Sequence, residues 1–123
     1  MTAMNDTDFE RDIFPLILTR LGERELHYTK TNRAPNRVDV RGREVYVMTN
    51  KSRPNYKKIP HEFFVKTWEI LCNHGYVTQQ QLSEEYYIKR SAFMLIAFDL
   101  LDFVKYDSEI NGIKHEKYIE RKR

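Results

Sequence analysis

The change of hydrophobic period, from helical spacing to alternation and back, constrains the fold of this 123-residue chain more than any other feature. Residues 7–21 carry an apolar side chain at every fourth position from Phe9 onward, which predicts an amphipathic helix capped by Thr7 or Asp8. Pro15 lies inside this segment and lacks the backbone N–H that a helix interior requires. We therefore expect either a kink or two short helices that meet at Pro15.

From Leu26 to Thr49 apolar residues alternate with polar ones, as they do in a strand with one buried face. A short strand at the start of this stretch is followed by a predicted β-hairpin that turns at Gly42, where a positive φ is needed. The valines of the hairpin are expected to face the core, and the opposite face carries mixed charges with an excess of cations. Residues 50–58 contain Pro54 and two asparagines, which favour a loop.

Helical spacing returns in the second half of the chain and ends in a strong turn signal. The predicted elements are a helix from Pro60 to Gly75, a short helix from the capping box Thr78–Gln81 to about Glu85, a helix from a cap on Ser91 to about Phe103, and a hairpin over 104–119 that turns at Asn111-Gly112.

This order of helix, short helix, helix and hairpin over residues 59–119 resembles a winged helix-turn-helix domain. The resemblance covers about half of the chain and depends on the order and spacing of the elements. It implies an α+β fold with a winged-helix-like three-helix core and a C-terminal β-hairpin, preceded over residues 1–58 by an amphipathic helix and a basic β-hairpin. Because 123 residues are typical of one domain, residues 1–123 are predicted to form a single unit.

Four short segments also resemble parts of small modules attached to bacterial restriction or defence nucleases. They are Arg33–Val38, Val47–Ser52, Ile59–Pro60 and Lys89–Phe93. This likeness implies an accessory role beside a nuclease and assigns no site residues.

The third helix of a winged-helix domain normally enters the major groove of DNA, but the predicted third helix lacks a suitable surface. After Lys89 and Arg90 its only charges are Asp99 and Asp102, and carboxylates repel phosphates. The other residues are mostly apolar, so we expect burial against the N-terminal helix or against a partner subunit. Contacts from this half are therefore expected at the start of the helix, where Lys89 and Arg90 lie.

The basic residues are concentrated in one part of the chain. The whole chain has a net charge of +3 and a pI near 9.0, whereas residues 20–58 hold eleven basic and four acidic residues, a net +7. Cations neutralise phosphates and interleaved tyrosines stack on bases, so this segment predicts a nucleic-acid interface, with double-stranded DNA as the expected partner. An ordinary solvated surface is the alternative. The predicted contact residues are Lys30, Arg33, Arg37, Arg41, Arg43, Lys51, Arg53, Lys57, Lys58, Lys89 and Arg90.

No motif in the chain indicates catalysis or a bound cofactor. The acidic-x-Lys triplet of a metal-dependent nuclease is missing from the predicted basic hairpin, and His61 and His115 each lack a second histidine four residues later. Only four glycines are present, and they form no phosphate-binding loop. We therefore predict a non-enzymatic protein with no catalytic residue, metal or cofactor.

Three features predict a cytoplasmic protein that does not enter membranes. The single cysteine, Cys72, has no intramolecular partner for a disulfide, which favours a reducing compartment. The first residues are polar and acidic, unlike a signal peptide. The longest apolar run, Ala92–Phe98, is far shorter than the roughly 18 residues of a membrane span.

A protein-interaction module is the second hypothesis for the function. Aromatic residues make up 13% of the chain, and many tyrosines lie in the C-terminal half, where they suit an interface. The apolar third helix would then form the contact in a homodimer or with a larger protein partner. The basic segment of residues 20–58 would contact an acidic partner. The first hypothesis remains a small nucleic-acid-binding regulator or nuclease accessory.

Overall fold

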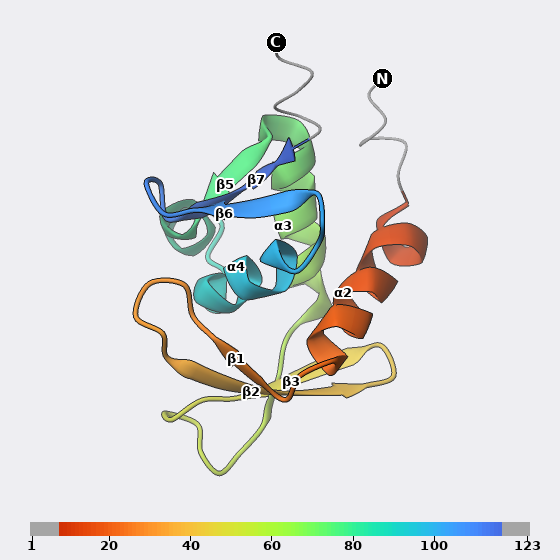
Figure 1. The fold of residues 1–123 in the computed structure, drawn as a ribbon, viewed down its shortest axis with the longest axis vertical. Helices are drawn as coiled ribbons and strands as arrows, with labels where there is room; N and C mark the ends of the chain where they lie inside the picture. Colours follow the sequence, from red (N-terminus) through yellow and green to blue (C-terminus); the bar gives the residue numbers. More distant parts are fainter. Residues whose placement is uncertain (1–7, 117–123) are drawn as a thin grey trace.

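In the computed structural model, which describes residues 8–116, two antiparallel sheets lie on opposite sides of helix α4 (Figure 1). The first sheet has the strand order β1-β2-β3-β4 and the second has the order β5-β7-β6. The predicted α+β class is confirmed. The elements are η1 (Phe9–Ile13), α2 (Phe14–Gly22), β1 (Leu26–Tyr28), β2 (Pro35–Arg41), β3 (Glu44–Met48), β4 (Lys57–Lys58), α3 (His61–His74), β5 (Tyr76–Thr78), η2 (Gln81–Glu85), α4 (Ser91–Asp99), β6 (Val104–Asp107) and β7 (Gly112–His115).

The N-terminal helical segment divides at the proline, as predicted. The π-helical turn η1 ends at Ile13 and α2 begins at Phe14, so Pro15 lies in the first turn of α2, where no intrahelical N–H is needed. Asp8 is the cap, because its Oδ1 accepts a hydrogen bond of 3.2 Å from the backbone N–H of Arg11. The apolar residues at every fourth position are buried.

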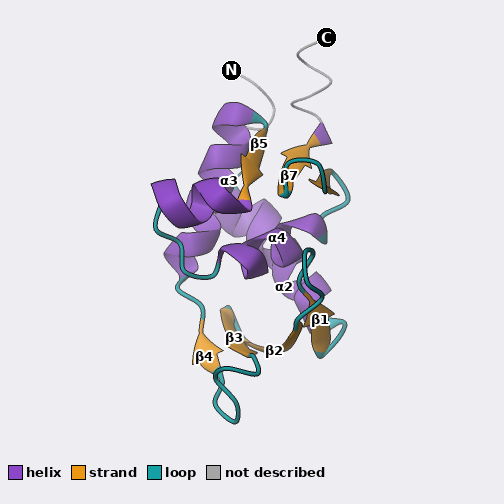
Figure 2. Ribbon diagram, turned by 90° about the vertical axis from the view of Figure 1, so that its left-hand side faces the viewer, coloured by secondary structure: helices purple, strands orange, loops and turns teal. Residues whose placement is uncertain are grey.

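The first sheet contains the predicted strand β1 and the predicted hairpin of β2 and β3. Val38 pairs with Val47 and Val40 with Val45, and Gly42 in the turn has a φ of +62°. The prediction that 50–58 is entirely a loop is wrong, because its last residues form β4 along the edge of β3 (Figure 2). Pro54 precedes this strand and removes no hydrogen bond from it.

The element order of the second half follows the prediction, with one additional strand. Helix α3 ends at His74 and is followed by the capping residue Gly75, whose φ is +80°. The capping box is present: Gln81 N donates to Thr78 Oγ1 over 3.0 Å, and Thr78 N donates to Gln81 Oε1 over 2.9 Å. The three residues before this box form β5, which pairs with β7 and was not predicted.

Helix α4 differs from the prediction at both ends. Its N-cap is Arg90 and no side chain caps it, so the predicted cap on Ser91 is wrong. It ends at Asp99 rather than near Phe103. The Asp99 carboxylate accepts a hydrogen bond of 2.8 Å from the backbone N–H of Tyr106, so the end of α4 is joined to strand β6.

The turn of the C-terminal hairpin lies before Gly112 rather than at the predicted pair Asn111-Gly112. Asp107 pairs with Gly112, so residues 108–111 form a four-residue loop and Gly112 belongs to β7. A Cβ atom on Gly112 would lie 2.4 Å from the carbonyl oxygen of Val77. The glycine is therefore required by the close approach of β5 rather than by the turn. The part of the predicted hairpin that extends to Ile119 lies beyond residue 116, outside the described chain.

Helix α4 is buried by the chain itself. Residues 93–98 are all buried, and they belong to one apolar cluster that also includes Val38, Val45 and Val47 of the first sheet and Leu71 of α3. Of the two explanations for this apolar helix, packing within the chain is confirmed, although the first sheet contributes to it as well as the N-terminal helix. Over residues 8–116, no helix is long and apolar enough to cross a membrane.

Candidate nucleic-acid interface

The face of the first sheet that points away from the core, here called the outer face, pairs its cations with carboxylates. Arg41 also lies over the ring of Tyr46, at 4.1 Å from the ring centre. The hydrogen bond from Lys58 lowers the pKa of the Glu44 carboxyl. The pairs are Arg37 with Glu25 (3.1 Å), Arg41 with Asp39 (2.7 Å) and Lys58 with Glu44 (2.6 Å). Since each positive charge has a negative neighbour, this face attracts phosphate only weakly.

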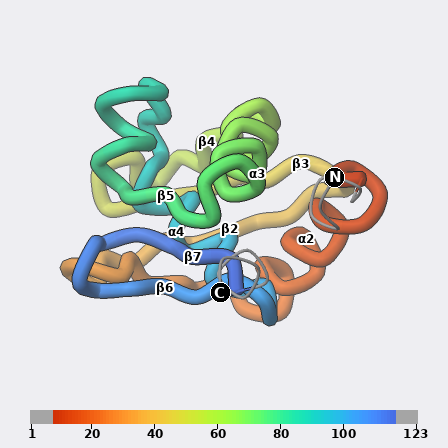
Figure 3. The backbone as a smooth tube through the Cα atoms, turned by 90° about the horizontal axis from the view of Figure 1, so that it is seen from above, coloured from red at the N-terminus to blue at the C-terminus, as the bar shows by residue number. Residues whose placement is uncertain are grey.

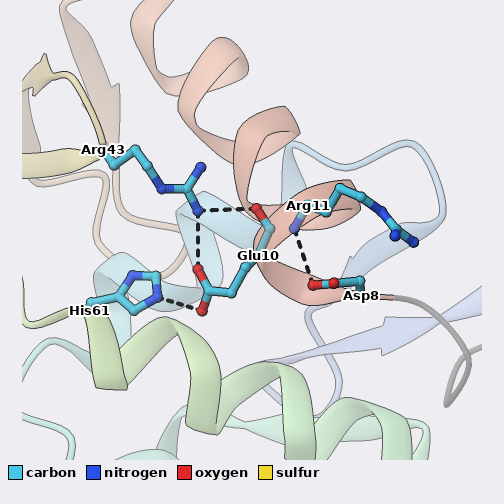
Figure 4. A network of polar contacts seen from close by, with 5 residues as sticks. All are labelled: Asp8, Glu10, Arg11, Arg43 and His61. Atoms are coloured by element: carbon cyan, nitrogen blue, oxygen red, sulfur yellow. Dashed lines mark hydrogen bonds and ion pairs between the residues drawn. The ribbon is translucent and has the colours of Figure 1, made fainter.

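Arg43 forms part of a contact network that joins the turn of the hairpin to two helices (Figure 4). Its Nη2 donates to the backbone oxygen and to Oε1 of Glu10, each over 3.0 Å. The other carboxylate oxygen of Glu10 lies 2.7 Å from Nε2 of His61 at the start of α3. The guanidinium also lies 5.2 Å from the ring centre of Phe14. Arg43 therefore connects the first sheet to η1 through Glu10 and to α2 through Phe14. Glu10 in turn connects η1 to the start of α3 through His61.

Lys30 is also engaged within the protein. Its Nζ forms an ion pair with Asp99 at the end of α4 and lies 5.7 Å from the ring centre of Tyr106. This contact holds the loop between β1 and β2 against the second sheet. Lys30 and Arg43 thus have structural partners, although the sequence groups them with the other predicted contact residues.

The other predicted contact residues have no carboxylate partner. Within residues 8–116, none of these six cations forms an ion pair: Arg33, Lys51, Arg53, Lys57, Lys89 and Arg90. Arg33 lies over the ring of Tyr28, at 5.0 Å from its centre. Arg53 and Lys57 are exposed on the segment that follows β3.

Three of these cations line a cleft of about 650 Å³ between the first sheet and the start of α4, here called the basic cleft. They are Lys51, Lys89 and Arg90. The remaining lining residues are five amides, four hydroxyls and four apolar residues: Asn32, Asn36, Asn50, Gln79, Asn111, Thr29, Thr31, Thr49, Ser91, Ala34, Pro35, Ala92 and Phe93. Among residues 8–116, no Asp or Glu lines this cleft. The cleft therefore has a positive potential that no lining carboxylate reduces.

The N-terminus of α4 opens into the basic cleft. Its first three residues, Ser91–Phe93, line the cleft directly, and no side chain caps this end of the helix. The N–H groups of a first helical turn carry a partial positive charge and have no acceptor within the helix. They add to the positive potential of Lys89 and Arg90.

A hydrogen-bond network around Asn111 holds the rim of the cleft. Its Oδ1 accepts from Thr31 Oγ1 (3.1 Å) and from the Tyr106 hydroxyl (2.8 Å), and its Nδ2 donates to Gln79 Oε1 (3.3 Å). The tip of the β6–β7 hairpin consequently lies against the loop between β1 and β2 (Figure 3). The sequence assigns Asn111 only to a turn, and nothing local in it indicates contacts with residues as distant as Thr31.

Strained backbone is concentrated around the basic cleft. In the described chain, the three non-glycine residues with positive φ are Arg33 (56°), Tyr87 (56°) and Asn111 (47°). Asn111 lines the cleft, Arg33 lies between two lining residues, and Tyr87 lies two residues before Lys89. A positive φ is uncommon for Arg and Tyr, whereas Asn adopts it several-fold more often than most residues. Strained backbone also clusters at functional sites.

The comparisons with known proteins give no relative from which a function could be transferred: no family model, curated protein or solved structure matches the chain. Among the residues that the structure describes, no group of three or more His, Cys, Asp or Glu side chains is placed to hold a metal ion. The groups that the basic cleft offers to a ligand are the cations, amides and hydroxyls of its lining.

Proposed function

We propose that this protein is a small, non-enzymatic nucleic-acid-binding protein that contacts the phosphate backbone through the basic cleft. The observation that carries this proposal is the presence of Lys51, Lys89 and Arg90 in a cleft with no lining carboxylate. Cations of this kind release counterions from phosphates and supply most of the affinity for nucleic acid. Arg33, Arg53 and Lys57, which also have no ion pair in the described chain, are proposed to position neighbouring phosphates.

The proposal includes a winged-helix-like core over residues 59–119. In its favour are the order helix, strand, helix, helix and hairpin, and a three-stranded sheet in which β5 pairs with β7. Helix α4, which corresponds to the groove-reading helix of such domains, is buried beneath the first sheet. Binding to double-stranded DNA is therefore proposed to use the start of α4 and the surrounding loops. The resemblance to modules attached to bacterial defence nucleases favours an accessory role.

Titration against duplex DNA, single-stranded DNA and RNA at two salt concentrations tests this function. We expect tighter binding at low salt for at least one of these nucleic acids. The double variant Lys89→Ala/Arg90→Ala is expected to weaken binding at least tenfold and to reduce the salt slope by about two. The matched control is Arg37→Ala/Arg41→Ala, which removes the same charge from the outer face. Absence of binding at low salt, or equal losses in the two variants, would contradict the proposal.

The adaptor hypothesis loses its predicted interface, because the apolar α4 is already covered by the chain's own residues. What remains of it is the tyrosine-rich surface, where Tyr76 and Tyr87 are exposed, and an acidic protein partner bound at the basic cleft. No affinity for any nucleic acid in the titration, combined with an intact fold, is the result that would favour this second function.

A further inference from the structure

The basic cleft is large enough to hold more than a phosphate group. A volume of about 650 Å³ lies within the range of roughly 300–1,000 Å³ that is typical of small-molecule pockets. The phosphates of a duplex lie on its outer surface and are reached by exposed side chains without a cavity. The cleft therefore has room for a group the size of a nucleotide.

The lining of the cleft suits a nucleobase. Amide groups read the edges of bases, because each offers a donor and an acceptor side by side. Asn50 makes no side-chain hydrogen bond within residues 8–116, so its amide is available to a ligand. The cleft is also lined by Pro35 and Ala92, which are half-buried and supply apolar surface against which a flat ring can pack.

From this arrangement we infer that the basic cleft takes up one unpaired nucleotide of a nucleic-acid strand. Its phosphate lies beside Lys89, Arg90 and the N-terminus of α4, and its base packs on the apolar wall with its edge toward Asn50 and Gln79. A base that remains paired and stacked has its edge and both faces covered, so only an unpaired or extruded base fits. This inference rests on the proposed function and adds the class of ligand to it.

Three duplexes of equal length separate base uptake from phosphate contact: a fully paired one, one with a single-nucleotide bulge, and one whose bulge is abasic. Fluorescence anisotropy gives the dissociation constant of each duplex. The set is measured once as DNA and once as RNA, which shows whether the protein prefers deoxyribose or ribose. We expect the protein to bind the duplex with the intact bulge about tenfold more tightly than either of the other two duplexes. Asn50→Ala/Gln79→Ala is expected to abolish this difference, whereas Asn55→Ala/Gln80→Ala, which changes neighbouring amides outside the cleft, keeps it.

A second measurement on the unmodified protein guards against misfolding of the variants. With 2-aminopurine as the bulged base, we expect its emission to change with the same dissociation constant as the anisotropy. Equal affinities for all three duplexes, or an unchanged emission on binding, would overturn nucleotide uptake and leave salt-dependent phosphate binding intact. Failure to bind any of these duplexes, together with no salt-dependent binding to single-stranded DNA or RNA, would overturn both proposals.

Discussion

The outer face and the basic cleft each present three cations, but they differ in what surrounds those cations. On the outer face Arg37, Arg41 and Lys58 each lie within 3.1 Å of a carboxylate oxygen. In the cleft, Lys51 and Arg90 lie among amides and hydroxyls with no lining carboxylate. The position of the acidic residues, rather than the number of basic ones, therefore determines which surface attracts an anion.

Removal of the cleft cations should have the largest effect. The triple variant Lys51→Ala/Lys89→Ala/Arg90→Ala is expected to weaken nucleic-acid binding about 100-fold and to reduce the salt slope by about three, because each lost phosphate contact reduces it by about one. Dissociation constants measured between 50 and 300 mM salt check this result. The equivalent triple substitution on the outer face, Arg37→Ala/Arg41→Ala/Lys58→Ala, is the control, and an equal loss there would remove the distinction between the two surfaces.

Introducing a carboxylate into the cleft should make it resemble the outer face. Asn50→Asp is expected to weaken binding about tenfold, because a negative charge beside Lys51 offsets its attraction for phosphate. Asn55→Asp changes the charge of the same loop by the same amount outside the cleft and is expected to have a smaller effect. Anisotropy titrations at low salt compare the two variants, and identical losses would mean that only the overall charge matters.

The reverse change removes carboxylates from the outer face. Asp39→Asn/Glu44→Gln leaves Arg41 and Lys58 without their partners and should strengthen binding about twofold at low salt, with the gain lost at high salt through screening. An unchanged Kd at low salt would mean that the carboxylates of the outer face do not weaken its attraction for phosphate.

Acidification should have the smallest effect. Among residues 8–116, none of those that line the cleft is an Asp, Glu, His or Cys, so binding is expected to be constant between pH 5.5 and 8. On the outer face, Lys58 lowers the pKa of Glu44, so this carboxylate stays ionised down to a lower pH than usual and its pairing persists across that window. A Kd that changes severalfold between pH 5.5 and 8 would place a titrating group at the binding surface.

The elements that the sequence predicts correctly are encoded by local patterns. The division of the N-terminal helix at Pro15, the hairpin at Gly42 and the capping box of Thr78 each depend on residues within a few positions of one another. Strands β4 and β5 were missed because they have only two and three residues and exist through pairing with distant strands. The Asn-Gly turn was placed wrongly because Gly112 is required by Val77 rather than by the turn.

The candidate site was predictable by residue type but not by arrangement. The excess of cations in residues 20–58 is visible in the sequence, yet Lys30 pairs with Asp99, 69 residues away, and Arg37 pairs with Glu25, 12 residues away. The basic cleft collects residues from Thr29 to Asn111. Which cations are neutralised within the protein therefore depends on tertiary contacts that no local pattern contains.

The construction of the cleft has a practical consequence for finding its ligand. Its lining residues come mainly from the first sheet with its loops and from the start of α4, so a ligand held there contacts both of these parts of the fold. A compound that binds only the folded protein stabilises it by about 2.7 kcal/mol at a concentration 100 times its Kd. Thermal-shift screening of oligonucleotides and mononucleotides can therefore report on cleft occupancy through the melting temperature of the entire chain.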